Sequence, residues 1–339
     1  MKRDPVGLSA IAAWDNLTEA FHAAARGKRA SAEVRAFATD LEGSLIALRR
    51  GLLDQAITPQ PMESFWIRDP KRRLIHAPGF RDRVLHHAIM ARVGPALERS
   101  LVFDTYACRK GKGALAAVRR CQHHARRHGV FVKSDIRGYF ASIDHAVLRA
   151  QLTRRLKDRG VLALLDRIIE SHAVTPGRGL PIGALTSQHF ANLYLADLDR
   201  FLLETLRVGG MTRYMDDIVW WRDDPVEARA DLAAVRAFAA DHLRLEIKPS
   251  VQIGRAEAGV MFCGFRVRPG SLGLSRRRRQ RYAAGRRRWE GAFGRGEIDA
   301  RGLQAGYAAT LAITAHADAA GWRREQLRRE PVADAMAEV

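Results

Sequence analysis

The segment Arg213–Trp221 (Arg-Tyr-Met-Asp-Asp-Ile-Val-Trp-Trp) constrains this chain more than any other. Two adjacent aspartates, Asp216 and Asp217, lie between apolar residues with the composition of strands. Neighbouring residues of a strand point to opposite faces, so both carboxylates are presented together only if a tight turn falls at the pair. Two carboxylates at a hairpin tip suit a divalent cation, because hard cations take oxygen ligands. A solvated Asp-Asp turn is the ordinary alternative.

A second acidic motif upstream favours the cation site. Residues Val130–Ile136 predict a buried strand that ends in an acid, Asp135. If the strands are neighbours in one sheet, three carboxylates come together and repel one another. Divalent ions relieve that repulsion, and two ions roughly 3.5–4 Å apart can activate an attacking 3′-hydroxyl and stabilise a leaving pyrophosphate. The pattern therefore predicts two Mg²⁺ ions as cofactors, with Mn²⁺ as a substitute.

The charge balance points to a polyanionic partner. The 339 residues carry a net charge of +20 with a pI of about 10.9, which indicates nucleic acid. Between Arg266 and Arg295, eleven arginines face one acid, Glu290, whereas a solvated helix face normally mixes both signs. The three cysteines form no CxxC pair and suit a reducing cytosol. No apolar run reaches the ~18 residues of a membrane span, so we expect a cytoplasmic protein with no membrane partner.

The order of predicted elements indicates an α+β fold with an antiparallel palm sheet. We expect a helical extension over 1–60, a catalytic core over 61–270, and a basic helical region over 271–339. The apolar spacing predicts helices over 81–99, 145–158, 161–172, 186–203 and 225–242. It predicts strands over 65–68, 73–77, 130–136, 245–248 and 261–267.

Several ordered motifs resemble those of one family. Residues 133–140 (Lys-Ser-Asp-Ile-Arg-Gly-Tyr-Phe) and 214–217 (Tyr-Met-Asp-Asp) resemble the two aspartate motifs of reverse transcriptases of bacterial retroelements. The segment 179–188 resembles their dNTP-site loop and helix, in a form most similar to diversity-generating retroelements. The fingers motifs of that group resemble segments 69–73, 80–88 and 106–113. One departure is Ala184, where the subgroup typically has Asn, and the missing amide would alter contacts around the nascent base pair.

The resemblance covers about residues 60–270 and implies a right-hand polymerase fold with fingers, palm and thumb. It implies metal ligation by Asp135, Asp216, Asp217 and the backbone carbonyl of Ile136. It implies triphosphate contacts from Lys71 and Arg73, a steric gate at Phe140, and a nucleotide pocket lined by Ile182 and Gln188. Lys248 resembles a lysine that protonates pyrophosphate, and the segment 262–265 resembles the primer-grip hairpin.

Nucleic-acid contacts are expected from two basic segments. The loop 106–113 contributes Arg109, Lys110 and Lys112, and the thumb contributes Arg276, Arg277, Arg278, Arg279, Arg286, Arg287 and Arg288. The interleaved Tyr282, Trp289 and Phe293 could stack on bases, but their helical spacing favours a core role. Asp144 either supports the metal site or caps the following helix, and we favour the cap.

The family resemblance implies an RNA-directed DNA polymerase that copies a template-repeat RNA for mutagenic retrohoming, with errors opposite template adenines. Its partners would be an RNA template, a cDNA primer, dNTPs and a small basic accessory protein. Retron, group II intron and phage-defence reverse transcriptases are the alternatives, although about 70 residues after the palm leave little room for an intron maturase and endonuclease region. A catalytically idle RNA-binding scaffold is a third hypothesis.

Overall fold

The computed structural model describes residues 3–68 and 72–330. Its chain forms two compact units, each assembled from three separate stretches. The first unit comprises Met1–Lys110, Asp135–Arg207 and Leu232–Pro249, and the second comprises Gly111–Ser134, Val208–Asp231 and Ser250–Val339. The three regions expected in chain order, 1–60, 61–270 and 271–339, remain a prediction.

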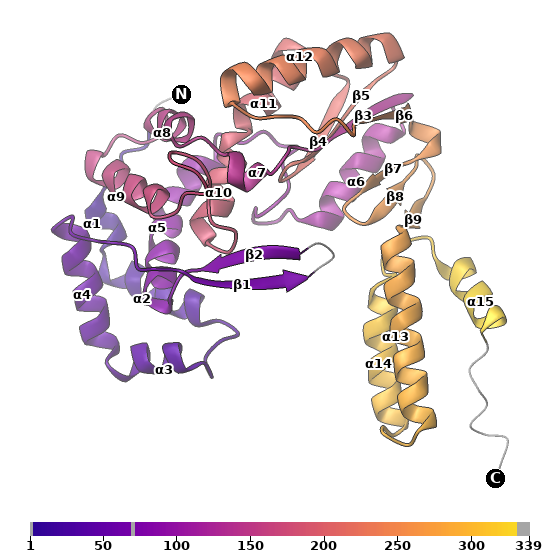
Figure 1. The fold of residues 1–339 in the computed structure, drawn as a ribbon, viewed down its shortest axis with the longest axis horizontal. Coiled ribbons are helices and arrows are strands. Elements are labelled where there is room, and N and C mark those ends of the chain that lie inside the picture. Colours follow the sequence, from indigo (N-terminus) through magenta and orange to yellow (C-terminus); the bar gives the residue numbers. More distant parts are fainter. Residues whose placement is uncertain (1–2, 69–71, 331–339) are drawn as a thin grey trace. The chain divides into compact units, whose positions relative to one another are not determined.

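The first unit begins with the expected helical extension (Figure 1). Ser31 and Asp40 cap the third and fourth helices by accepting hydrogen bonds from backbone N–H groups, as favoured N-cap residues do. Phe21, Phe37 and Phe80 pack their rings together at 5.3–6.0 Å. The helices of this extension are α1 (Leu8–Ile11), α2 (Trp14–Ala25), α3 (Ala32–Thr39) and α4 (Leu41–Leu53), and α2 packs on α5 (Phe80–Glu98).

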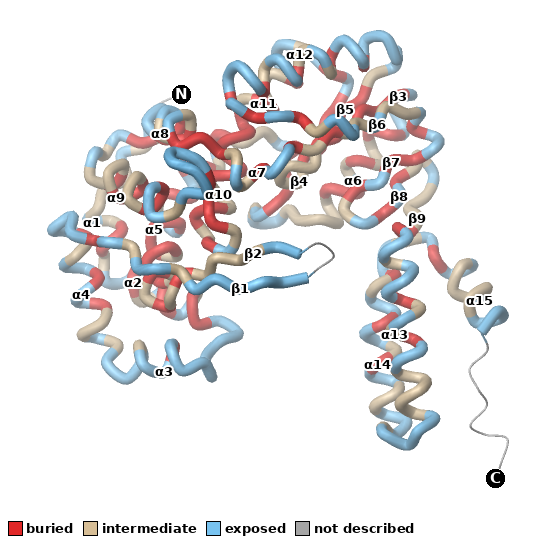
Figure 2. The backbone as a smooth tube through the Cα atoms, in the orientation of Figure 1, coloured by how far each residue is buried: buried red, intermediate tan, exposed pale blue. Residues whose placement is uncertain are grey.

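The expected basic hairpin is present in the first unit. Strands β1 (Glu63–Arg68) and β2 (Arg72–Ala77) pair antiparallel, and both strands are exposed toward the tip (Figure 2). The tip itself, with the predicted triphosphate contact Lys71, lies outside the described residues.

The predicted helix over 186–203 is wrong in its continuity. It consists of α10 (Leu185–Tyr194), α11 (Ala196–Arg200) and a π-helical turn (Phe201–Thr205). The break falls at Leu195, whose backbone (φ −89°, ψ 0°) leaves the regular helical geometry, while the apolar spacing that suggested one helix runs on through the break. Helices α8 (His145–Thr153) and α9 (Arg159–Glu170) lie close to the predicted positions, and the short α7 (Tyr139–Ser142) was not predicted.

The second unit holds an antiparallel four-stranded sheet of order β4-β5-β3-β6, as predicted for the palm. Its strands are β4 (Gly210–Tyr214), β5 (Asp217–Arg222), β3 (Val130–Ser134) and β6 (Gln252–Arg255). Helix α6 (Ala114–Ala125) packs against β4. The strand predicted over 245–248 is wrong: Ile247 forms only a single bridge, to Ile136, and both residues belong to the first unit. Helix α12 (Pro225–Leu243) precedes this segment. The fourth strand is instead β6, further along the chain.

A second sheet and three helices complete this unit. Strands β7 (Val260–Phe262), β8 (Phe265–Val267) and β9 (Leu272–Leu274) pair antiparallel in that order. The expected basic helices follow as α13 (Arg276–Gly294), α14 (Ala300–Ala312) and α15 (Ala320–Arg329), and α13 lies alongside α14 (Figure 1). A Cβ atom on Gly306 of α14 would lie 2.2 Å from the Trp289 ring, so glycine lets the two helices approach. No helix within residues 3–68 and 72–330 has the length and apolarity to cross a membrane.

Candidate active site

The Asp-Asp pair lies at a hairpin turn, as the sequence predicts. Tyr214 of β4 pairs with Asp217 of β5, which leaves Met215 and Asp216 as a two-residue turn. Met215 has a left-handed backbone (φ 58°), a conformation that costs energy for a residue with a Cβ atom. The hairpin therefore presents Asp216 from the turn and Asp217 from the first position of β5.

Buried side chains hold this turn from behind. Ile218, Val219, Trp220 and Trp221 are all 0% exposed, so both faces of β5 are covered and its register cannot slip. Arg213 is also 0% exposed, and its Nη1 donates a hydrogen bond of 3.0 Å to the Met215 carbonyl oxygen. The guanidinium thus braces the strained residue beside Asp216. Sequence reasoning missed this role, because the sequence does not reveal whether an arginine before the turn points inward or outward.

A second residue that sequence reasoning missed is Lys133 on β3. Its Nζ lies 3.1 Å from Asp217 Oδ2 and donates a 2.5 Å hydrogen bond to the Met261 carbonyl oxygen of β7. The nearby thiol of Cys263 has its pKa raised to about 12, chiefly by burial and further by the Asp217 carboxylate. Cys263 therefore stays a neutral thiol beside the ion pair.

Asp135 is held in a similar way in the first unit. Lys248 Nζ forms an ion pair with Asp135 Oδ2, and the Lys248 backbone N–H donates 2.9 Å to the Asp135 carbonyl oxygen. The other carboxylate oxygen, Oδ1, is buried and has no hydrogen-bond partner among the described residues. Lys248 thus lies directly against one of the predicted metal ligands.

The donors at these positions fit a divalent cation in kind. Asp135, Asp216 and Asp217 supply the hard carboxylate oxygens that Mg²⁺ prefers, and the buried, unpaired Oδ1 of Asp135 offers a free ligand atom. Across residues 3–68 and 72–330, however, no group of three or more His, Cys, Asp or Glu side chains is arranged to hold a metal ion. The ammonium groups of Lys133 and Lys248 supply positive charge at two of the carboxylates.

The predicted nucleotide residues all belong to the first unit. Phe140 on α7 is partly exposed, and its backbone carbonyl accepts a hydrogen bond of 2.8 Å from the Leu180 N–H. The Ile182 carbonyl accepts 2.8 Å from the His76 N–H of β2, which ties the loop before α10 to the β1–β2 hairpin. Arg73 is exposed on β2.

A glycine makes that tie possible. Gly183 has φ +133°, and a Cβ atom there would lie 2.8 Å from the His76 carbonyl oxygen. Gly183 and Gln188 also line a cavity of about 160 Å³ with His86. Burial lowers the pKa of His86 to about 4, with the neighbouring His87 adding to the shift. His86 is therefore a neutral packing residue.

Asp144 caps α8, as predicted. Its carboxylate accepts hydrogen bonds from the N–H groups of Ala146 and Val147. Burial works to raise the pKa of Asp144, but the Arg244 guanidinium at 2.9 Å and the two N–H groups outweigh it and lower the pKa overall. The carboxylate is committed to these partners and to the start of the helix.

The basic loop 106–113 is less available for phosphate than its sequence indicates. Arg109 has a side chain that is only 9% exposed and pairs with Glu98 at 2.6 Å. Its Nη1 also donates to the carbonyl oxygens of Val102 and Thr105. Arg109 therefore braces its own loop, whereas Lys110 is exposed and Lys112 is partly exposed.

The arginines of α13 divide into two groups. Arg286 is 3% exposed and its Nε lies 2.9 Å from Glu290 Oε1, while Arg278 donates to the Ile313 carbonyl and covers the Phe265 ring at 4.0 Å. Tyr282 is buried against Trp322, consistent with the favoured core role. The exposed members of the predicted set are Arg276, Arg277, Arg279, Arg287 and Arg288.

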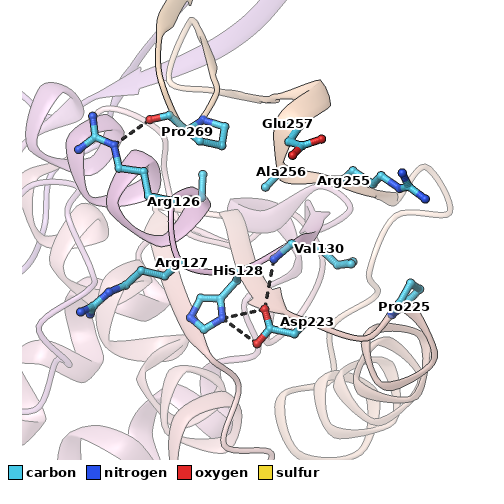
Figure 3. A pocket seen from close by; sticks show the side chains of 12 residues that line it. Arg126, Arg127, His128, Val130, Asp223, Pro225, Arg255, Ala256, Glu257 and Pro269 are labelled. Carbon is cyan, nitrogen blue, oxygen red and sulfur yellow. Dashed lines mark hydrogen bonds and ion pairs between the residues drawn. The ribbon is translucent and has the colours of Figure 1, made fainter.

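A cavity of about 580 Å³ lies at the far end of the palm sheet. Figure 3 shows His128 and Asp223 joined in its centre, with Arg127 and Arg255 pointing away from each other on opposite sides. His128 Nδ1 lies 3.2 Å from Asp223 Oδ2. Asp223 follows the last residue of β5 and Asp217 is the first, so strand length separates them by about 20 Å at roughly 3.4 Å per residue. This cavity is not part of the Asp-Asp turn.

Residues 67–265 match the profile of the reverse transcriptase (RNA-dependent DNA polymerase) family. The chain belongs to this family. The match spans more than half of the chain and includes the Asp-Asp turn, Asp135 and the β1–β2 hairpin from residue 67 onward. It confirms the family resemblance expected from the motifs.

The curated relatives include a protein encoded by a group II intron and a protein of Escherichia coli. The group II intron-encoded protein LtrA of Lactococcus lactis subsp. cremoris is 24% identical over 164 residues, which are 46% of this chain and 27% of LtrA. Protein YkfC of Escherichia coli K12 is 25% identical over 170 residues, which are 46% of this chain and 45% of YkfC. The chain thus matches less than half the length of either relative.

The fold is shared with a solved polymerase structure. Apo telomerase from Candida tropicalis superimposes with a TM-score of 0.50 at 10% identity, covering 76% of this chain and 57% of that one. At this identity the likeness concerns the fold alone. It supports the predicted α+β right-hand polymerase fold.

Proposed function

We propose that the chain is an RNA-directed DNA polymerase that extends a primer by nucleotidyl transfer at Asp135, Asp216 and Asp217. The observation that carries the proposal is the register of the palm sheet. Asp135 is bonded to Ser134, which pairs with Ile218, the residue after Asp217. In the proposed reaction Asp135 would act together with Asp216 and Asp217, as the two aspartate motifs of the family imply.

In this proposal the three aspartates, with the Ile136 carbonyl, would hold two divalent ions, Mg²⁺ with Mn²⁺ as a substitute. Bound ions would lower the pKa of the primer 3′-hydroxyl and neutralise charge on the phosphates. The 3′-hydroxyl would lose its proton to solvent and its oxygen would form a bond to the α-phosphorus of the dNTP, while the bond from that phosphorus to the bridging oxygen breaks and pyrophosphate leaves. Lys248, beside Asp135, would donate a proton to the departing pyrophosphate.

The remaining residues would select and hold the nucleotide. Arg73 and Lys71 would bind the triphosphate as cations, and Ile182 and Gln188 would contact the nucleotide. The ring of Phe140 would exclude a ribose 2′-hydroxyl, the group that distinguishes RNA from DNA precursors. The exposed arginines of α13 and the lysines of the loop 106–113 would bind the phosphate backbone of the template and primer.

The polymerase could work in either of two kinds of retroelement. The Ile-Gly-x-x-x-Ser-Gln form of segment 182–188 supports a diversity-generating retroelement, with mutagenic retrohoming and a small basic accessory protein in the cytoplasm. The similarity to the group II intron-encoded protein LtrA supports the intron-type alternative. A catalytically idle scaffold has less support, because all three aspartates are present.

The test is primer extension on an RNA template with dNTPs and Mg²⁺, followed by sequencing of the cDNA. We expect extension that Asp216→Ala/Asp217→Ala abolishes. Errors concentrated opposite template adenines would favour the diversity-generating setting, and accurate cDNA would favour the intron type. Absence of cDNA from the wild type, even with native RNA and the candidate accessory protein, would refute the polymerase.

A further inference from the structure

Lys133 is a charged residue in an otherwise buried strand, β3. The other four residues of β3 are buried, and Lys133 is the single partly exposed one, paired with Val219 on β5 and Gln252 on β6. Its side chain is only 23% exposed. A charge held this far from water needs specific partners to offset its desolvation.

The two partners of Lys133 belong to different sheets of the second unit. Asp217 begins β5 of the four-stranded sheet, and Met261 lies in β7 of the three-stranded sheet. An ammonium group has three donors, and two of them make these contacts. One side chain therefore joins the carboxylate of the Asp-Asp turn to the backbone of the β7–β8 hairpin.

That hairpin is the segment expected to hold the primer. Phe262 pairs with Phe265, and Cys263 (φ 45°) and Gly264 (φ 81°) form a two-residue turn. A Cβ atom on Gly264 would lie 2.9 Å from Arg278 Nε, so the turn is closely packed. Because Met261 lies two residues before Cys263, the Lys133 hydrogen bond fixes the base of this turn.

We propose that Lys133 is a positioning residue that ties the primer-holding hairpin to Asp217 and acts as the carboxylate's counter-cation until a divalent ion binds. The inference rests on the proposed polymerase function. Its two consequences are separable. A divalent ion that binds Asp217 must displace Lys133, so the lysine weakens binding of the ion. The Lys133–Met261 hydrogen bond sets where the primer terminus lies.

Two substitutions separate these contacts. Lys133→Met keeps the length of the side chain and removes both contacts, whereas Lys133→Gln keeps a donor for the Met261 carbonyl and removes the charge beside Asp217. Lys157→Met is the matched control, because Lys157 is exposed on the first unit and its replacement removes the same charge. Each protein is melted over a Mg²⁺ titration without substrates, which needs no turnover.

For metal binding, we expect both Lys133 variants to show the same Mg²⁺-dependent rise in Tm at a concentration at least threefold lower than the wild type, because binding to the folded state raises Tm by mass action. Lys157→Met should match the wild type. If Lys133→Gln needs the same or a higher Mg²⁺ concentration than the wild type for that rise, the counter-cation role is overturned. If Lys133→Met does not fold, Lys133→Gln alone decides this point.

For primer placement, a primer with a photoreactive 3′-terminal nucleotide is cross-linked to each protein, and the attachment site is mapped. We expect cross-linking within 260–267 in the wild type and Lys133→Gln, and at least a fivefold loss in Lys133→Met. Equal cross-linking in all proteins would overturn the positioning role. If the wild type makes no cDNA yet shows these metal and cross-linking responses, the polymerase proposal fails while the role of Lys133 stands.

Discussion

The Asp-Asp turn and helix α13 serve the proposed reaction in opposite ways. The turn is fixed by strand register and by flanking residues with no exposure, Arg213 before it and Ile218–Trp221 after it. In α13, five of the seven predicted arginines are exposed and lie on a helix surface rather than in a buried core. The turn should therefore depend on single atoms, and the helix on summed charge.

The largest effect is expected at the turn. Asp217→Asn keeps the size of the side chain but removes the negative charge that would hold a divalent ion, so single-turnover extension should fall about a thousandfold. Asp223→Asn is the matched control, because Asp223 lies at the opposite end of β5 and pairs with His128. Retention of more than a tenth of the wild-type rate by Asp217→Asn would remove this aspartate from the chemistry.

The next effect tests the brace behind the turn. Arg213→Met leaves the Met215 carbonyl without its buried donor, which should cost about 1–3 kcal/mol in the free energy of unfolding. Because the strained Met215 then relaxes, extension should fall by roughly tenfold or more. Arg229→Met, at an exposed position on α12, should change unfolding by less than about 0.5 kcal/mol. Denaturant unfolding and primer extension measure both quantities, and equal results for the two variants would contradict the bracing role.

A smaller effect concerns the choice of sugar. Phe140→Ala removes the ring that would meet a 2′-hydroxyl, so the ratio of kcat/KM for dNTP over rNTP should fall by about tenfold or more. The ratio, rather than the rate, is diagnostic, since a general packing defect lowers both terms. Phe103→Ala, which removes a ring that is 67% exposed, should leave the ratio unchanged. If both variants keep the wild-type ratio, Phe140 is not the gate.

The sequence predicts features that depend on local geometry better than features that depend on contacts between distant residues. The turn was predictable because period-two strand geometry leaves one way to present adjacent acids, and the cap at Asp144 because its local hydrogen bonds span three residues. The hydrogen bond from Lys133 to Met261 joins residues 128 positions apart, and no local pattern encodes it. The inward turn of Arg109 likewise depends on Glu98 and on carbonyl oxygens that only the folded loop supplies.

The exposed face of α13 should produce a graded effect. Replacing Arg276, Arg279 and Arg288 by Gln should make the slope of log K against log salt shallower by about 0.9 for each phosphate that is no longer neutralised, up to about 2.7 for a primer–template duplex. The control removes the same charge from the helical extension, through Arg29→Gln/Arg35→Gln/Arg49→Gln at exposed positions. Equal changes in slope would mean that net charge, and not the face of α13, governs binding.

The smallest effect on RNA affinity is expected from an arginine of the same helix. Arg286 is buried and paired with Glu290, which also accepts from the Tyr307 hydroxyl, so its charge is already neutralised inside the helical pair. Arg286→Met should leave the salt slope unchanged and lower the free energy of unfolding by about 1–3 kcal/mol, because Glu290 loses its buried partner. Salt-dependent binding and denaturant unfolding measure the two. A shallower slope with unchanged stability would mean that Arg286 binds phosphate, and the division of α13 into an outward and an inward set would be wrong.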